Sequence, residues 1–144
     1  MRSKVSDGRL ALLASVPIFA GCTGRELEAI DRLVDDIDVN AGDVLVREGA
    51  PGRESFVVVA GEATVTVDGR QVAVLGPGDF FGEMSILDPG RPRSATVTAS
   101  TAMRLLVLEP RSFSTLVSLP CVAHKVILGL IRRLRATEAA AANT

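Results

Sequence analysis

Six short runs rich in β-branched residues, separated by glycine-containing turns, occupy the middle of the chain. The runs are Val44–Val46, Phe56–Ala60, Ala63–Val67, Gln71–Leu75, Ser94–Ala99 and Met103–Leu108. In Ala63–Val67, apolar residues alternate with threonine, so a strand there would have one buried and one polar face. Asp68-Gly69, which follows directly, is typical of a type I′ hairpin turn. Short strands at this regular spacing predict a small antiparallel barrel or roll.

A helical pattern precedes this region. Thr23 followed by Glu26 is a capping box, with Thr23 as the N-cap. Apolar residues then recur at helical spacing, namely Leu27, Ile30, Val34 and Ile37. The charged residues between them are expected to form a solvated face, namely Glu28, Asp31, Arg32, Asp35 and Asp36. The pattern therefore predicts a helix over Thr23–Val39.

Residues 112–144 are predicted to be helical again. Pro120 ends one short piece, and a longer helix with an apolar face follows. This face consists of Val122, Val126, Ile127, Leu130, Ile131 and Leu134. Its predicted role is core packing, and a dimer interface is the alternative. Gly129 weakens this helix by ~1 kcal/mol relative to alanine.

Composition disfavours several classes of function. The 144 residues suffice for one domain with its own core. A net charge of −1 disfavours a protein whose main task is to bind nucleic acid phosphates. The single histidine, His124, excludes most histidine-based metal sites, and no predicted strand contains histidine, so a metal-dependent enzyme on a similar barrel is disfavoured too.

The two cysteines and the N-terminus bear on the compartment. Cys22 and Cys121 lie far apart and form no CxxC motif, so we predict buried free thiols in a reducing, cytoplasmic compartment. An alternative is a bacterial lipoprotein signal, with basic residues, the apolar stretch Leu10–Ala20 and then Cys22. Asp7 and Pro17 argue against it and favour a short helix that ends at Pro17. No other run reaches the ~18 apolar residues that a membrane span needs.

The segment Phe81–Val97 interrupts the strand pattern and carries groups suited to an anion. Gly82 allows a turn and a close approach to a ligand. Glu83–Leu87 can form one helical turn, whose free N–H groups attract an anion. Arg93 can donate to two phosphate oxygens at once. Further donors are available at Ser94 and Ala95.

Glu83 is the unexpected residue beside this anion site, because a carboxylate repels a phosphate. Its presence makes sense if the ligand also offers a hydroxyl donor, such as a ribose 2′-OH. Together with Arg93, Glu83 therefore indicates a sugar phosphate more closely than a free phosphate.

These residues resemble the phosphate-binding cassette of the cyclic nucleotide-binding domain family. This family is the module of cAMP receptor proteins and of regulatory subunits of cAMP-dependent kinases. Its cassette has the form F-G-E, two small or apolar residues, L, a variable loop, then R-[STA]-A-x-V. Phe81–Leu87 and Arg93–Val97 match this form in order, with Ile86 at the L position. Similar strand and turn signatures extend the resemblance over residues 10–138.

The resemblance implies a mainly β fold with flanking helices in a single domain over residues 1–144. The expected architecture is an antiparallel β-roll or jelly-roll barrel with N-terminal helices, a short cassette helix and a C-terminal lid helix. The parts would be an N-terminal helical part (8–40), a β-roll (41–112) that contains the cassette (81–97), and C-terminal helices (112–138). Cleavage before Cys22 would remove part of this fold, which further disfavours the lipoprotein alternative.

The resemblance also implies a ligand and its contacts. Glu83 would accept the ribose 2′-OH, and Arg93 would pair with the phosphate. Further phosphate and ribose contacts would come from Gly82, Met84, Ser85, Ser94 and Ala95. Serine at position 94 favours cAMP, with cGMP as the other candidate. Val65 and Val72 would line the pocket, while on the C-terminal helix Arg133 would pair with Glu83 and Thr137 would bond the adenine.

The predicted function is that of a cytoplasmic regulatory sensor without catalytic activity, metal or cofactor. No helix-turn-helix, kinase-inhibitory or channel segment resembling those of the family's larger members is found in the chain. The expected output is therefore an unidentified effector protein or self-association, with no direct nucleic acid or membrane partner. The alternative is a ligand-independent protein-interaction module on the same fold.

Overall fold

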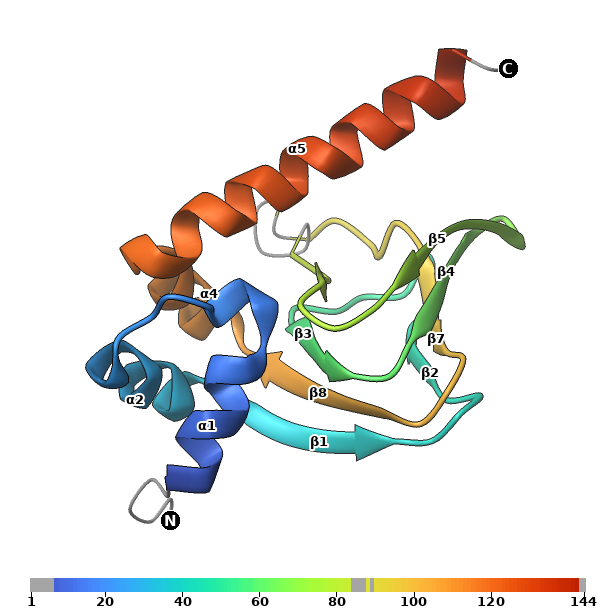
Figure 1. The fold of residues 1–144 in the computed structure, drawn as a ribbon. Helices are drawn as coiled ribbons and strands as arrows, with labels where there is room; N and C mark the ends of the chain where they lie inside the picture. The colour runs from blue at the N-terminus through green and yellow to red at the C-terminus, as the bar shows by residue number, and fades with distance from the viewer. Residues whose placement is uncertain (1–6, 84–87, 89, 143–144) are drawn as a thin grey trace.

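The computed structural model describes residues 7–83, 88 and 90–142, which form a β-roll flanked by helices (Figure 1). The strands are β1 (Asp35–Val39), β2 (Val44–Val46), β3 (Ser55–Ala60), β4 (Ala63–Val67), β5 (Arg70–Leu75), β6 (Phe80–Phe81), β7 (Thr96–Ala99) and β8 (Met103–Leu108). The helices are α1 (Asp7–Ser15), the 3-10 helix η1 (Pro17–Phe19), α2 (Gly24–Leu33), α4 (Pro110–Val117) and α5 (Pro120–Ala142). The expected fold class is confirmed. The predicted cassette helix lies mostly at residues 84–87, outside the described residues.

The strands of the described residues form two four-stranded antiparallel sheets. Their orders are β1-β8-β3-β6 and β2-β7-β4-β5. The shorter helices gather at one end of the roll, and α5 runs across its open side (Figure 1). The roll therefore opens toward α5.

Strands β3 and β8 have a hydrophobic core on each face. Val57 and Leu106 face the helices and pack in one core, whereas Val58 and Leu105 face the inside of the roll. Successive strand side chains point to opposite faces, so a strand buried on both faces is apolar throughout. The helices complete the first core with Leu13, Phe19, Ile30, Phe113, Leu116 and Val122, among others.

The hairpin between β4 and β5 turns at Asp68-Gly69. Both residues have positive φ, 52° and 76° respectively, as a type I′ turn requires. The Asp68 amide donates to Glu48 Oε1 at 3.0 Å, which ties the turn to the neighbouring loop. The hairpin prediction is confirmed.

The predicted helix over Thr23–Val39 is wrong in its second half. The capping box of Thr23 and Glu26 is present, but α2 ends at Leu33. The next residues form β1, which pairs with β8 in the register Asp35↔Val107 to Val39↔Met103. This pairing satisfies the strand's backbone groups and outweighs the helical spacing, so Ile37 is 38% exposed instead of buried.

Two aspartates expected on a solvated face are ion-paired instead. Asp31 is buried and accepts a hydrogen bond from Arg9. On β1, Asp36 accepts hydrogen bonds from Arg104 Nε at 2.9 Å and from Arg104 Nη2 at 2.5 Å. These hydrogen bonds from Arg104 are the main reason that the pKa of Asp36 lies below its ordinary value.

Replacing Asp36 by asparagine is expected to lower the free energy of unfolding by about 1 kcal/mol at pH 7. Because the folded-state pKa is lowered, the carboxylate stabilises the fold above its unfolded-state pKa of 3.8. This contribution is lost as the pH falls through the lower folded-state pKa. Urea denaturation should therefore separate variant and wild type at pH 7, and the difference should shrink as the pH falls below 3.8.

Asp38→Asn is the matched control, because Asp38 is exposed on the same strand. It should change the free energy of unfolding by less than about 0.5 kcal/mol. A difference between Asp36→Asn and wild type that stays constant with pH would contradict the role given to the Asp36 carboxylate.

Helix α5 is buried only at its beginning. Pro120 begins this helix, a position that suits proline. Val122 and Val126 are buried in the core, as predicted for core packing. Leu130 is partly buried and packs against the same core, whereas Ile127, Ile131 and Leu134 of the predicted face are exposed and do not belong to it. No described helix alone is long and apolar enough to span a membrane; α4 and residues 120–136 of α5 meet that criterion only as a pair bent by 104°.

The prediction of free cysteines is wrong. Cys22 and Cys121 form a disulfide with their Cα atoms 5.3 Å apart. The two residues are separated by 99 positions, but the segment before α2 packs beside the start of α5. Sequence spacing cannot show such a long-range approach. The cysteines therefore give no argument for a reducing compartment.

Candidate functional site

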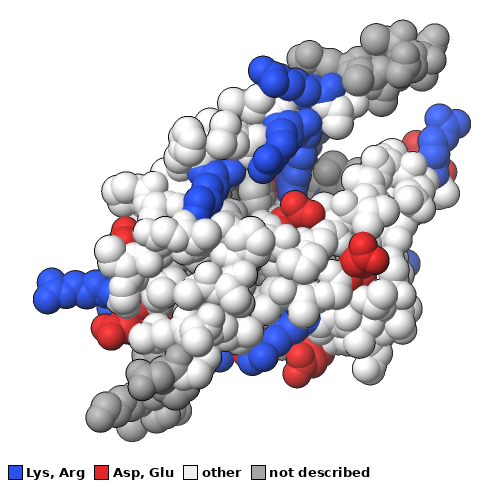
Figure 2. Space-filling view, viewed as in Figure 1, with Lys and Arg blue, Asp and Glu red and all other residues white. Residues whose placement is uncertain are grey.

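A cavity of about 630 Å³ lies between the roll and α5. Its apolar part comes from the roll, through residues such as Val65, Ala73, Leu75 and Val97. Its charged part comes from Asp79, Glu83, Arg93 and the basic residues of α5. Figure 2 shows Lys and Arg side chains gathered along α5 on the side of the hollow. The cavity thus combines an apolar wall with a cationic rim, which suits a ligand with an apolar ring and an anionic group.

Arg93 lies at the wall of this cavity, in the loop before β7. Arg93 is only 8% exposed. The guanidinium donates from Nη2 to the Glu54 carbonyl at 2.9 Å and from Nη1 to the Gly82 carbonyl at 3.2 Å. Burial lowers the pKa of Arg93, and the carboxylates of Glu54 and Glu83 partly offset this effect. The group stays charged and is held in one orientation.

Two glycines make room for this guanidinium. A Cβ on Gly52 would lie within 2.3 Å of Arg93 Nε. Gly82 has φ +85°, and a Cβ there would lie 2.7 Å from the Glu54 carbonyl and 2.9 Å from Arg93 Nη1. Both positions therefore require glycine for space, and Gly82 also for its backbone conformation. The sequence analysis did not identify this packing role of Gly52.

Glu83 is held from the opposite side by α5. The side chain is buried, and Glu83 Oε1 lies 2.5 Å from Arg133 Nη1, which confirms the predicted pair. The Arg133 guanidinium also lies over the Phe80 ring, 4.5 Å from its centroid. One helical turn earlier, a Cβ on Gly129 would lie 2.8 Å from Phe80 Cε1. Gly129 therefore lets α5 approach the roll closely enough for Arg133 to reach Glu83.

Most of the predicted site residues line this one cavity. Those found there are Val65, Gly82, Glu83, Arg93, Ser94, Ala95 and Arg133. Met84 and Ser85 lie outside the described residues. Thr137 belongs to α5, but its side chain is not among those the structure describes.

Val72 is a wrong assignment. It is 56% exposed and does not line the cavity, whereas Ala73 and Val74 do. The register of β4 and β5 pairs Val65 with Ala73 and then Thr66 with Gln71, so an irregularity leaves Val72 between paired positions. Such a bulge changes which side chains face inward, and alternation read from the sequence cannot locate it.

Sequence reasoning missed several lining residues from the helices. Pro17 and Ile18 of η1 contribute to one wall. From α5, the missed positions are Lys125, Gly129, Arg132 and Ala136. With Arg133 they recur at helical spacing, so a stripe of small and basic residues was the available signal. In the described part of the chain, no group of three or more His, Cys, Asp or Glu side chains is placed to hold a metal ion.

Residues 37–118, more than half of the chain, match the family described as the cyclic nucleotide-binding domain. The chain belongs to this family. The matched range includes the roll, Gly82, Glu83 and Arg93, so the family match and the cavity geometry concern the same part of the molecule.

Individual relatives carry this domain within longer chains. A CRP-like cAMP-activated global transcriptional regulator of Mycobacterium tuberculosis is 30% identical over 133 residues, which cover 88% of this chain and 59% of the regulator. A cyclic nucleotide-gated potassium channel of Mesorhizobium japonicum is 43% identical over 107 residues, covering 74% of this chain and 29% of the channel.

Solved structures agree in fold. The catabolite activator protein of Thermus thermophilus matches with a TM-score of 0.71 at 33% identity, covering 85% of this chain and 60% of that chain. A cAMP-binding acyltransferase from Mycobacterium smegmatis matches with a TM-score of 0.68 at 29% identity, covering 78% and 36% respectively. The chain therefore spans only part of the length of each of these proteins.

Proposed function

We propose that the chain binds cAMP in the cavity beneath α5 and acts as a regulatory module without a catalytic step of its own. One observation carries the proposal: the buried Arg93 guanidinium and the Glu83 carboxylate converge on the same apolar cavity. Arg93 would pair with the phosphate, and Glu83 would accept from the ribose 2′-OH. The volume lies within the range of about 300–1,000 Å³ typical of small-ligand sites.

The choice of cAMP over cGMP has separate support. Ser94 lines the cavity, and serine there favours cAMP by resemblance to the family. The Mycobacterium tuberculosis relative is named as cAMP-activated, and the acyltransferase as cAMP-binding. Thr137 is proposed to bond the adenine from α5.

The output is proposed to pass to an effector protein or to a change in self-association. The relatives connect this domain to a transcriptional regulator, a channel and an acyltransferase. The same ligand-binding module thus occurs with effectors of different kinds. We therefore assign regulation to this chain, and no particular effector.

Isothermal titration with cAMP and with cGMP, side by side, tests the proposal. We expect a saturable heat with both or with cAMP alone, and the tighter binding for cAMP. Tighter binding of cGMP would overturn the choice of nucleotide. Absence of binding by either nucleotide would overturn the site and leave the ligand-independent interaction module as the function of this fold.

Glu83→Gln is expected to reduce discrimination against 2′-deoxy-cAMP. A hydrogen bond from the ribose hydroxyl to a carboxylate is worth about 1.5 kcal/mol or more, so the wild type should prefer cAMP over the deoxy ligand about tenfold or more, and an amide accepts the same hydroxyl less strongly. The variant should show a clearly smaller preference. Glu54→Gln is the matched control, because its exposed carboxylate also acts on Arg93 electrostatically, but Glu54 does not line the cavity. Equal discrimination in Glu83→Gln and wild type would place the ribose elsewhere.

A further inference from the structure

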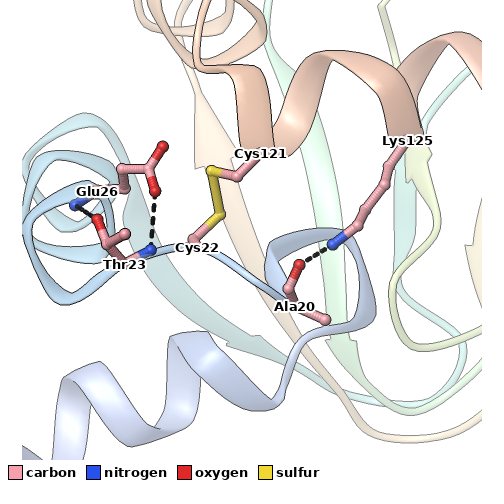
Figure 3. Close-up of a disulfide and its surroundings, with 6 residues drawn as sticks. All are labelled: Ala20, Cys22, Thr23, Glu26, Cys121 and Lys125. Carbon is pink, nitrogen blue, oxygen red and sulfur yellow. Dashed lines mark hydrogen bonds between the residues drawn. A yellow bond between two sulfur atoms is a disulfide. The ribbon is translucent and has the colours of Figure 1, made fainter.

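The Cys22–Cys121 disulfide joins two segments that both continue into walls of the cavity (Figure 3). Cys22 follows η1, whose Pro17 and Ile18 line the cavity. Cys121 lies in the first turn of α5, the helix that contributes Lys125, Gly129 and Arg133 to the lining of the cavity. The covalent bond therefore joins these two segments close to the residues of each that line the cavity.

A second contact lies beside the disulfide. Lys125 Nζ donates a hydrogen bond to the Ala20 carbonyl, two residues before Cys22 (Figure 3). The same two segments are thus joined at two neighbouring points. This arrangement fixes the direction in which α5 leaves the helical end of the molecule.

Beyond this anchor, the apolar packing of α5 decreases along the described part of the helix. Val122 and Val126 are buried and Leu130 is partly buried, but Ile127 and Leu134 are 55% and 59% exposed. Farther along the helix, Arg133 forms an ion pair with Glu83 and lies over the Phe80 ring. A helix held weakly along its length depends strongly on how its base is anchored.

We propose that the Cys22–Cys121 disulfide is a redox-sensitive latch for α5, and that its reduction weakens nucleotide binding. The inference rests on the proposed function for its ligand. With the disulfide intact, α5 stays docked and Arg133 stays on Glu83. Once it is reduced, α5 leaves the docked position in a fraction of the molecules. Apparent affinity falls in proportion to the fraction that stays docked, and bound nucleotide dissociates faster.

The reaction is an ordinary thiol–disulfide exchange with a dithiol or a small thiol as reductant. A reductant thiolate attacks one sulfur and forms a mixed disulfide, and the other cysteine leaves as a thiolate that takes up a proton. A second reductant thiol then attacks the mixed disulfide and releases the second cysteine. Two electrons and two protons pass to the protein, and the reductant leaves as its own disulfide. Both cysteines are partly exposed, so a thiol can reach them.

The test compares the full chain in two redox forms. Protein oxidised in air and protein reduced with a phosphine are first distinguished by alkylation and mass measurement, with no label and two labels expected. Dissociation of a fluorescent cAMP analogue is then followed by stopped flow, and affinity by titration. We expect dissociation to be about threefold to tenfold faster and Kd to rise by a similar factor after reduction. Equal rates and equal affinity in the two forms would overturn the latch.

Cys22→Ser and Cys121→Ser separate the disulfide from other effects of the reductant. Each variant should behave like the reduced wild type, and reductant should have no further effect on it. An equal response of the variants and the wild type to reductant would overturn the proposal. If a variant fails to fold, as judged by circular dichroism, the comparison of the two wild-type forms alone decides.

Hydrogen exchange without nucleotide distinguishes failure of the latch from failure of the proposed function. Reduction should speed exchange of the α5 amides over residues 121–136 and leave β3 and β8 unchanged. If α5 responds in this way but neither form binds cAMP, the conformational part of the latch stands, while the proposed function and its consequence for binding fail. Exchange that is identical in the two forms, or two alkylated cysteines after oxidation, would overturn the latch whatever the chain binds.

Discussion

Arg93→Ala is expected to weaken cAMP binding by about 2–5 kcal/mol. The Arg93 guanidinium is buried, and the carbonyls of Glu54 and Gly82 already orient it. The substitution therefore removes a charged partner of the bound phosphate that the fold holds in place. Arg93→Lys should recover part of this loss, because lysine keeps the charge but lacks the fork of donors. Isothermal titration with cAMP measures both variants.

Arg91→Ala is the control for Arg93. This arginine lies in the same loop but is exposed, with its side chain 3.8 Å from Asp88. Its removal should leave the affinity within about threefold of the wild type. Affinity that is unchanged in Arg93→Ala, in a variant that unfolds at the normal temperature, would remove Arg93 from the phosphate site.

Gly82→Ala is expected to have the second large effect, on stability and on binding together. A residue with a side chain at φ +85° costs about 1–2 kcal/mol, and the added Cβ would collide with the Glu54 carbonyl and with Arg93. We expect the free energy of unfolding to fall by about 2–4 kcal/mol. The displaced Arg93 should weaken cAMP binding about tenfold or more. Urea denaturation and titration with cAMP provide the two measurements.

Gly42→Ala separates backbone strain from the collision. Gly42 has φ +93°, but a Cβ there would meet nothing within 4 Å. It should lower stability by about 1–2 kcal/mol and leave binding unchanged. If Gly82→Ala affects stability no more than Gly42→Ala does and leaves binding intact, the close packing of Gly82 against Arg93 has no functional role.

Local patterns predicted the elements whose structure depends on neighbouring residues. The strand Ala63–Val67, the turn at Asp68-Gly69 and the capping box of Thr23 occur as expected. The position of Arg93 and Glu83 in one cavity also agreed with expectation, through resemblance to a family cassette. In each case the deciding residues lie within one continuous stretch of sequence.

The failures share a different cause. Residues 35–39 form a strand instead of the predicted helix because they pair with β8, which lies far along the chain. Val72 does not line the cavity because the irregular pairing of β4 with β5 changes which side chains face inward. Gly52 packs against Arg93, which lies far from it in the sequence. The sequence around each of these residues does not predict these contacts.

The residues themselves specified turns, caps, strand-forming runs and the chemical groups that could hold a sugar phosphate, because those properties depend on near neighbours along the chain. The fold alone revealed the Cys22–Cys121 bond, the position of the Arg133 guanidinium over the Phe80 ring, and the two cavity-lining segments that this bond joins. Such features depend on how segments that are distant in the sequence pack together. The same local pattern is compatible with several strand registers and several helix positions, and burial and backbone pairing select one of them.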